Sequence, residues 1–242
     1  MDLSRLNKEQ KEAVKHMEGP LLILAGAGSG KTTMMTHRIA YMLEKGVSPY
    51  NILAVTFTNK AAGEMKDRIE SLTGGTRGMW VMTFHAMCVR ILRNHGEVLG
   101  FKNGFSIYDE SDKKALLKRI VKDLKIDEKI YPVSYLGSVI SSCKEAEEDP
   151  DDYIENNSMN FKAETVAKVY ARYMEDLQQN NAMDFDDLLW NAVKLFEASS
   201  EVLSYYQERF KYIMVDEYQD TNYLQYKLIH ALAEKSHNLC VV

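Results

Sequence analysis

Residues 21–33 read LLILAGAGSGKTT, and this stretch predicts how the chain around it folds. Four apolar residues at 21–24 are typical of a short strand that is covered on both faces. The loop that follows has almost no side-chain bulk, so its backbone N–H groups can close around a chain of phosphates. Lys31 and Thr32 come next, at the start of a helix whose unpaired N–H groups and dipole favour an anion.

These residue types at this spacing indicate a nucleoside triphosphate site. The Lys31 ammonium would reach the β- and γ-phosphates, and the Thr32 hydroxyl would take a position on Mg²⁺. The strict pattern G-x-x-x-x-G-K-[ST] has its first glycine where this chain has Ala25. A glycine-rich turn between a strand and a helix is the alternative, but the amphipathic helix after the loop favours the nucleotide. The predicted contacts are Ala25, Gly26, Ala27, Gly28, Ser29, Gly30, Lys31 and Thr32.

The composition is that of an ordinary soluble globular protein. Of 242 residues, 45% are hydrophobic and 27% are charged. The net charge of -5 excludes a general coating of nucleic acid but leaves a local groove open. Cys88, Cys143 and Cys240 are too few and too far apart for a disulfide framework or a zinc site. Because no membrane-length apolar run or signal-peptide core is seen, we expect a cytoplasmic protein.

Apolar segments alternate with helical ones along most of the chain. Strands are predicted at about 51–57, 79–83 and 212–215, each next to an amphipathic helix. This order predicts an α/β fold with a parallel, doubly wound sheet and helices on both faces, whose ligands lie at the carboxyl ends of the strands. The polar residues at 58–60 and 83–85 stand at such ends, on the same rim as the glycine-rich loop.

A second informative stretch is YIMVDEYQD at residues 212–220. An apolar strand here delivers two adjacent carboxylates, Asp216 and Glu217, beside the phosphate loop. Metal-assisted phosphoryl transfer requires this arrangement, because one carboxylate holds Mg²⁺ and the other orients or deprotonates the attacking water. An acidic helix cap is the alternative, and the presence of the phosphate loop in the same chain favours catalysis.

Gln10 allows two interpretations. Asn7 and Gln10 have the spacing of a capping box at the start of a helix, and this reading is favoured when the two are taken alone. The position of Gln10 just ahead of the phosphate loop adds a second role. A carboxamide can pair with both a donor and an acceptor on an adenine edge.

From about residue 109 the pattern becomes helical, which predicts a helical subdomain inserted into the sheet domain. A helix at 112–125 is expected to bury Ala115, Leu116, Ile120, Val121 and Leu124. Its lysines are expected on a solvated face, with phosphate contacts as the alternative. Residues 145–152, EAEEDPDD, indicate an exposed acidic loop. Asp184 is predicted to cap a helix, and the aspartates beside it are too clustered at that cap to predict a metal site.

Six segments in fixed order resemble the UvrD/Rep/PcrA group of superfamily 1 DNA helicases, and the PcrA members in particular. They are LNKEQ at 6–10, AGAGSGKT at 25–32, TFTNKAA at 56–62, TFH at 83–85, DFDDL at 184–188 and DEYQDTN at 216–222. The resemblance spans the whole chain. Their order and spacing are far more specific than any single motif.

The resemblance implies ATP and Mg²⁺ as ligands. Gln10 would read adenine, Lys31 would act in catalysis, Thr32 and Asp216 would hold the metal, and Glu217 would be the catalytic base. The residues expected to touch single-stranded DNA are Phe57, Thr58, Asn59, Lys60, Thr83, His85 and Phe185. The expected domains are a RecA-like ATP-binding domain (1A) at 1–108 and 184–242 and the inserted subdomain (1B) at 109–183.

By the same resemblance, the activity would be ATP-driven movement in the 3′-to-5′ direction along single-stranded DNA. Duplex junctions and repair or replication proteins would be the further partners, and no membrane is implied. The sequence departs from the family at Thr33, where members commonly have an arginine that stacks on adenine. It also ends at Val242, ahead of a second RecA-like domain that carries arginine fingers. We therefore expect the 242 residues alone to bind ATP weakly and not to unwind DNA.

Two other functions are compatible with these features. The chain could be the helicase part of a RecB/AddA-like helicase-nuclease. It could also act as a nucleotide-dependent module that binds a partner without catalysis, using the acidic loop and the helical insertion as surfaces.

Overall fold

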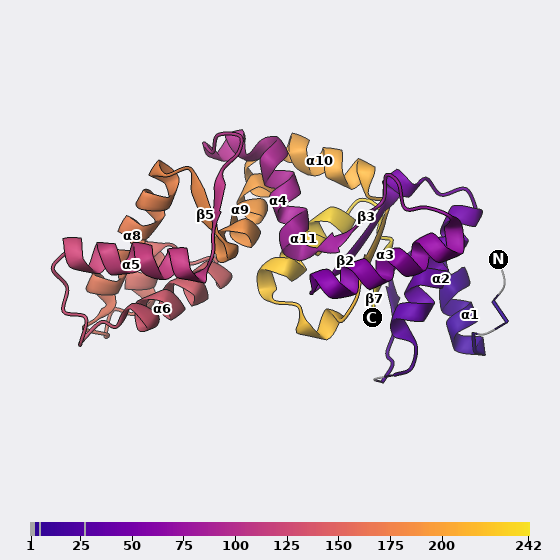
Figure 1. Cartoon of the computed structure of the whole chain (residues 1–242), viewed down its shortest axis with the longest axis horizontal. Helices are drawn as coiled ribbons and strands as arrows, with labels where there is room; N and C mark the ends of the chain where they lie inside the picture. The colour runs from indigo at the N-terminus through magenta and orange to yellow at the C-terminus, as the bar shows by residue number, and fades with distance from the viewer. Residues whose placement is uncertain (1–2, 5, 27) are drawn as a thin grey trace. The chain divides into compact units, whose positions relative to one another are not determined.

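The computed structural model describes residues 3–4, 6–26 and 28–242, and its contacts divide the chain into two compact units (Figure 1). The first unit holds the described residues up to Met87 together with Ser199–Thr221 and Gln225–Val242. The second holds Cys88–Ala198 and Asn222–Leu224. A compact unit groups residues by the density of their contacts, so the division into domains at 109 and 183 stays a prediction.

The first unit is built on a five-stranded sheet in which all neighbouring strands run parallel. Across the sheet the order is β1 (Leu21–Leu22), β7 (Leu239–Val241), β6 (Tyr212–Val215), β2 (Ile52–Thr56) and β3 (Trp80–Thr83). Thr56 pairs with Thr83, and Val55 pairs with Val215. The register therefore brings the carboxyl ends of β2, β3 and β6 to one edge of the sheet.

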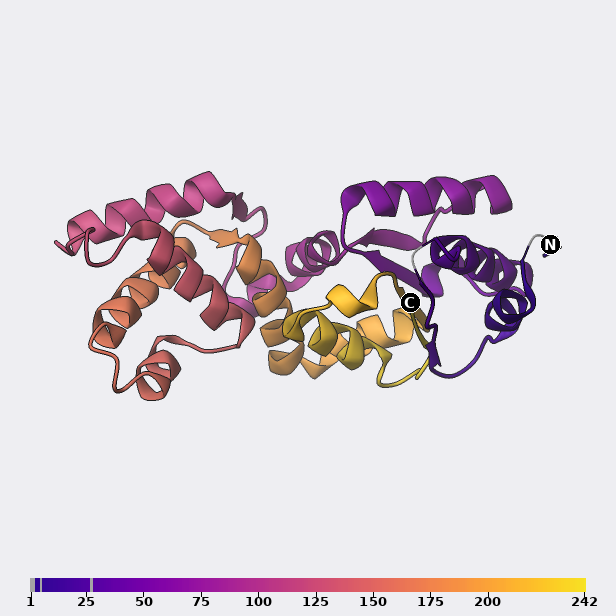
Figure 2. The ribbon, with the colours of Figure 1, turned by 90° about the horizontal axis from the view of Figure 1, so that it is seen from below.

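Helices cover both faces of this sheet, as the sequence predicts. One face is covered by α1 (Lys8–Lys15), α2 (Lys31–Glu44) and α3 (Asn59–Thr73). There Ile39 and Met65 share a buried cluster with Ala54 of β2 and Met214 of β6. On the other face lies α10 (Ser200–Arg209), where the ring of Tyr206 lies 6.0 Å from that of Trp80. Figure 2 shows α3 and α10 on opposite sides of the strands.

The remaining elements of the first unit connect these layers. The 3₁₀ turn η1 (Pro49–Asn51) leads into β2, and η3 (Tyr218–Asp220) follows β6. The helix α4 (Phe84–His95) begins directly after β3 and runs on into the second unit, while α11 (Tyr223–Ala233) precedes β7.

The strand expected at residues 21–24 is shorter and less buried than predicted. Only Leu21 and Leu22 pair, and the side chains of Leu22 and Leu24 are 62% and 86% exposed. Leu21 and Ile23 pack against the buried cluster instead. Because β1 is the edge of the sheet and pairs only with β7, it buries alternate side chains on one face rather than all four.

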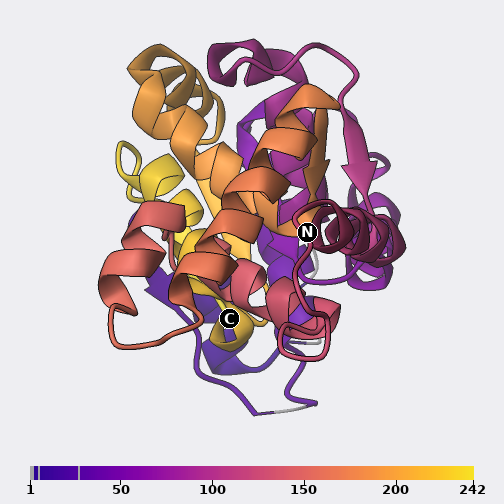
Figure 3. The same cartoon turned by 90° about the vertical axis from the view of Figure 1, so that its left-hand side faces the viewer.

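The second unit is mainly helical, with a two-stranded parallel sheet (Figure 3). The sheet pairs β4 with β5. The helix α8 contacts α5, α6 and α7 and forms the centre of the bundle. The elements are η2 (Gly96–Leu99), β4 (Ser106–Tyr108), α5 (Glu110–Asp123), α6 (Val133–Glu145), α7 (Pro150–Asn156), α8 (Ala163–Gln179), β5 (Ala182–Asp184) and α9 (Phe185–Ala198).

Two expectations for this unit are wrong. Ala115 is exposed although it was expected to be buried. Lys113 is buried although it was expected on the solvated face, because it forms an ion pair with Asp186, which lies outside its own helix. The acidic segment at 145–152 is not all loop, since Asp149 caps α7 by accepting hydrogen bonds from the N–H groups of Asp151 and Asp152.

Cys88, Cys143 and Cys240 are buried, and their thiols are free. Within the described ranges, the helices are either too short or too polar to cross a bilayer.

Candidate nucleotide and DNA site

The loop between β1 and α2 has the backbone shape that glycine permits. Gly28 and Gly30 have φ angles of +74° and +82°, which residues with a Cβ rarely adopt. A Cβ on Gly30 would also lie 3.1 Å from Nε2 of Gln10. Gly30 begins α2 and has no side chain, so the cap residue itself makes no hydrogen bond to the first N–H groups of the helix. Ala27 lies outside the described residues.

Gln10 forms the predicted capping box and also reaches the loop. Its Oε1 accepts from the N–H of Asn7 at 3.0 Å, and Oδ1 of Asn7 accepts from the N–H of Gln10 at 2.8 Å. Nε2 of Gln10 donates to the carbonyl of Ser29 at 2.9 Å. A cavity of about 320 Å³ lies here. Gln10, Ala25, Ser29, Gly30 and Lys31 are among the residues that line it.

The carboxylates after β6 meet the first turn of α2. Nζ of Lys31 lies 3.2 Å from Oε2 of Glu217, and the hydroxyl of Thr32 lies 3.5 Å from Oδ2 of Asp216. Asp216 is fixed by its own N–H, which donates to the carbonyl of Val55 at 3.0 Å. The structure therefore brings together the four side chains that the sequence predicts for catalysis and metal binding.

The two carboxylates have different electrostatic surroundings. Burial and the neighbouring charge of Glu217 raise the pKa of Asp216. Hydrogen bonds from Gln219, at 2.6 Å, and from Lys31 lower the pKa of Glu217. Glu217 also has a left-handed backbone with φ of 53°, which costs about 1–3 kcal/mol in a non-glycine residue. Strain of this kind is concentrated at functional sites. Sequence reasoning did not assign Gln219 a role, although it lies two residues beyond Glu217 in the same motif.

The predicted DNA residues of the first unit stand at the ends of β2 and β3. Phe57, Thr58, Asn59 and Lys60 follow β2, while Thr83 and His85 stand at the end of β3 and the start of α4. Because Thr56 pairs with Thr83, the two groups lie at neighbouring strand ends. Asn59 and Lys60 are exposed, and the side chain of Phe57 is partly exposed.

Three polar or aromatic groups at this edge have structural partners. The hydroxyl of Thr58 accepts from the N–H of Ala61 at 3.1 Å and caps α3, and that of Thr83 accepts from the N–H of Ala86 at 3.2 Å. Phe57 packs on the buried ring of Phe84, with 5.6 Å between ring centroids. The sequence prediction missed Phe84, the apolar residue between Thr83 and His85, as the support of Phe57.

Phe185 belongs to the second unit, where it is the first residue of α9 and is 46% exposed. Asp184 precedes it and caps the helix as predicted, since its Oδ1 accepts from the N–H of Asp187 at 2.8 Å. The N–H of Asp184 in turn donates to Oδ2 of Asp187 at 3.0 Å. The aspartates around Phe185 also have lysine partners, which the sequence pattern does not show.

Lys144 connects the two capping carboxylates. Its Nζ lies 2.8 Å from Oδ2 of Asp184 and 2.7 Å from Oδ1 of Asp187. Burial raises the pKa of Asp187 to about 6. The positive charge of Lys144 lowers this pKa, and the negative charge of Asp184 raises it. Burial acts on Asp184 in the same direction, but the charges of Lys144 and Lys113 outweigh it and lower the pKa of Asp184 to about 2.

A protein-family model and individual relatives place this chain in the same family. The family model described as "UvrD/REP helicase N-terminal domain" matches residues 6–242. The chain is 51% identical to the ATP-dependent DNA helicase PcrA of Staphylococcus aureus strain NCTC 8325, over 99% of this chain and 33% of that protein. It is also 51% identical to the PcrA helicase of Staphylococcus epidermidis strain ATCC 12228, with the same coverage. The chain thus spans about a third of the length of the curated relatives it matches.

The pKa of Asp187 predicts how the stability of the second unit depends on pH. Between its ordinary pKa of 3.8 and the folded value of about 6, the folded protein binds a proton that the unfolded chain does not. The Asp187 contribution to the free energy of unfolding should therefore increase as the pH falls from about 7 to about 4. Below that range the contribution of Asp184 is lost, because its folded pKa is depressed to about 2.

Urea unfolding at several pH values measures this effect. A Trp80→Phe background leaves Trp190 of α9 as the only tryptophan, so its fluorescence reports on the second unit. Asp187→Asn in that background should flatten the pH dependence between about pH 4 and 7. The same dependence with and without Asp187→Asn would show that another group binds the proton.

Proposed function

Because the chain belongs to the UvrD/Rep helicase family, whose N-terminal domain it matches, we propose that it is the ATP-binding part of a DNA helicase that moves 3′ to 5′ along single-stranded DNA. The observation that carries the proposal is the meeting of Lys31 with Glu217 and of Thr32 with Asp216 at one edge of the sheet. Phosphoryl transfer needs a phosphate-binding cation, oxygen ligands for a metal and a base for water, and these four side chains provide them.

Lys31 and the loop bind the phosphates. The start of α2 offers N–H groups that no side chain caps, and the helix dipole adds to the attraction. Lys31 bonds to Glu217 in the structure, and a triphosphate carries more negative charge than one carboxylate. The triphosphate therefore competes successfully for Lys31. Glu217, which keeps its hydrogen bond from Gln219, is then an ionised carboxylate able to accept the proton of the attacking water.

Thr32 and Asp216 fit a magnesium ion. Both present oxygen atoms, which Mg²⁺ prefers, and the two oxygens lie 3.5 Å apart. Thr32 and Asp216 would hold the Mg²⁺, which would supply positive charge against the negative charge that develops on the phosphates. Asp216 is held in place for this role by its backbone bond to β2.

The edge formed by the ends of β2 and β3 binds the single strand. Phe57 stacks on a base, supported from behind by Phe84, while Asn59, Lys60 and His85 contact the backbone. Thr58 and Thr83 hold the starts of α3 and α4 by their caps and so fix the positions of their neighbours. Phe185 of the second unit provides a further stacking surface.

The proposal extends to the organisation and setting of the protein. Residues 1–108 and 184–242 form the RecA-like domain 1A, and residues 109–183 form the inserted subdomain 1B. Gln10 binds the adenine edge from the wall of the cavity that it shares with the phosphate loop. The helicase acts in the cytoplasm at junctions between single-stranded and duplex DNA, together with repair or replication proteins.

Replacing Lys31 tests the nucleotide site. Lys31→Ala should weaken the binding of ATP with Mg²⁺ by about 10- to 100-fold, because a hydrogen bond from a charged group contributes about 1.5–3 kcal/mol. Isothermal titration calorimetry measures the affinity. Lys45→Ala, which removes an exposed lysine at the other end of α2, is the control and should bind normally. Equal affinity in Lys31→Ala and Lys45→Ala would mean that the loop is only structural.

Replacing Phe57 tests the DNA edge. Stacking of one base contributes about 1–3 kcal/mol, so Phe57→Ala should weaken the binding of an oligothymidylate by about tenfold. Binding should be micromolar or weaker at low salt and should fall as salt rises. Fluorescence anisotropy measures both, and circular dichroism checks the fold. Tyr50→Ala is the control, because Tyr50 is an exposed aromatic residue at the opposite end of β2. Unchanged affinity in Phe57→Ala, or nanomolar binding that ignores salt, would exclude this edge as the main contact.

A further inference from the structure

Two lysines of the second unit are buried against one short acidic segment. The side chains of Lys144 and Lys113 are 0% and 6% exposed. Nζ of Lys113 lies 2.8 Å from Oδ2 of Asp186 and 3.9 Å from Oδ2 of Asp184, while Lys144 bonds to Asp184 and Asp187. Three of the four residues at 184–187 thus bond to lysines from other helices, and the fourth is Phe185.

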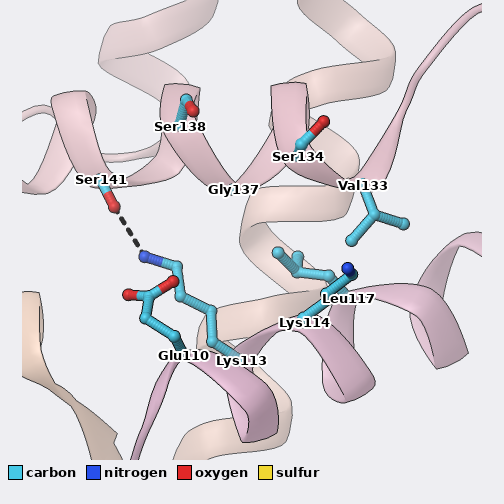
Figure 4. A pocket seen from close by; sticks show the side chains of 9 residues that line it. All are labelled: Glu110, Lys113, Lys114, Leu117, Val133, Ser134, Gly137, Ser138 and Ser141. Carbon is cyan, nitrogen blue, oxygen red and sulfur yellow. Dashed lines mark hydrogen bonds between the residues drawn. The ribbon is translucent and has the colours of Figure 1, made fainter.

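Further hydrogen bonds complete this group, which we name the 184–187 network. The hydroxyl of Tyr173 donates to Oδ2 of Asp184 at 2.8 Å. Ser141 donates to Oδ2 of Asp186 at 2.6 Å and receives a hydrogen bond from Lys113, also at 2.6 Å. Figure 4 shows Lys113 of α5 and Ser141 of α6 joined in this way. Three helices, α5, α6 and α8, therefore converge on the turn between β5 and α9.

Stability alone does not account for this network. Buried ion pairs lose the hydration of both charges, and apolar side chains of similar size often stabilise a fold as well or better. The network also opposes three carboxylates with only two ammonium groups. What such a network does provide is a fixed geometry, because each hydrogen bond constrains both distance and direction.

The geometry that it fixes is that of the backbone around Phe185. Asp184 is bonded on one side of Phe185, and Asp186 and Asp187 are bonded on the other. The turn can therefore rotate only if several buried bonds break together. Lys113 cannot contact a phosphate directly without leaving Asp186 and Ser141, because its side chain is almost completely buried.

We propose that Lys113 and Lys144 are positioning residues that hold the turn between β5 and α9 so that Phe185 keeps the orientation required for base stacking. The inference rests on the proposed function, which assigns Phe185 to single-stranded DNA. A side chain that is already oriented loses less conformational freedom when it binds, so the network increases affinity without touching the DNA. Lys113 and Lys144 then act only through Phe185.

A double-mutant cycle between Lys113 and Phe185 tests this coupling. Lys113→Met is preferable to a change at Lys144, because Asp186 is partly exposed and keeps its bond to Ser141. A cavity of about 520 Å³ beside Lys113 also leaves space for the new side chain. The affinity for an oligothymidylate is measured by fluorescence anisotropy at low salt for the unmodified chain, both single variants and the double variant.

We expect Phe185→Ala to weaken DNA binding by about tenfold and Lys113→Met by about fivefold. In the Phe185→Ala background, Lys113→Met should weaken it by less than about twofold, because the two residues act as one unit. Asp186→Asn breaks the same ion pair from the other side and should reproduce the Lys113→Met result. Lys114→Met, which removes an exposed charge one residue away, should have little effect. ATP affinity should be unchanged in all of them.

The outcomes separate this inference from the proposed function. If Lys113→Met weakens binding by the same factor with and without Phe185, the positioning role is wrong while the DNA site stands. If Lys114→Met weakens binding as much as Lys113→Met, a general loss of positive charge is responsible and the positioning role is again wrong. If Phe185→Ala leaves the affinity unchanged, the assignment of Phe185 to DNA fails, and the positioning role fails with it.

Discussion

The parallel direction of every strand in the five-stranded sheet is the constraint on which the site depends. Parallel strands end at the same edge, so residues that are distant in the sequence meet there. The register places Thr56 beside Thr83 and brings Val55 beside Val215, which directly precedes Asp216. The phosphate loop follows β1 at this same edge. Lys31 and Glu217 are 186 positions apart in the sequence, and this arrangement brings Nζ and Oε2 to within 3.2 Å of each other.

Electrostatic contacts then distinguish the charged groups of the candidate site. Lys31 and Gln219 both bond to the carboxylate of Glu217, and in the proposed mechanism phosphates compete for the same ammonium group. Asp216 is buried beside Glu217, and both the burial and the neighbouring charge raise its pKa. The two carboxylates are adjacent in sequence, but their surroundings shift their pKa values in opposite directions. A similar logic applies in the second unit, where lysines hold the carboxylates around Phe185.

Features of the fold and of the candidate site that depend on local spacing were predictable from the sequence. The capping box of Asn7 and Gln10, the glycine loop and the position of Asp216 after a strand all depend on residues within a few positions of one another. The burial of β1 and of Lys113 was not predictable in this way. Whether Leu22 is covered depends on its place at the sheet edge. Lys113 is buried because it bonds to Asp186, which lies 73 positions away in the sequence. The pairing of Lys144 with Asp187 likewise requires the packed helices.

The central expectation is that Lys31 exchanges Glu217 for the phosphates of a nucleotide. A crystal structure of the chain with Mg²⁺ and a non-hydrolysable ATP analogue tests this most directly. It should show Nζ of Lys31 bonded to the β- and γ-phosphates, the metal at Thr32 and Asp216, and the carboxylate of Glu217 separated from Lys31 and facing the γ-phosphate. A nucleotide bound elsewhere, with the Lys31–Glu217 pair intact, would contradict the account.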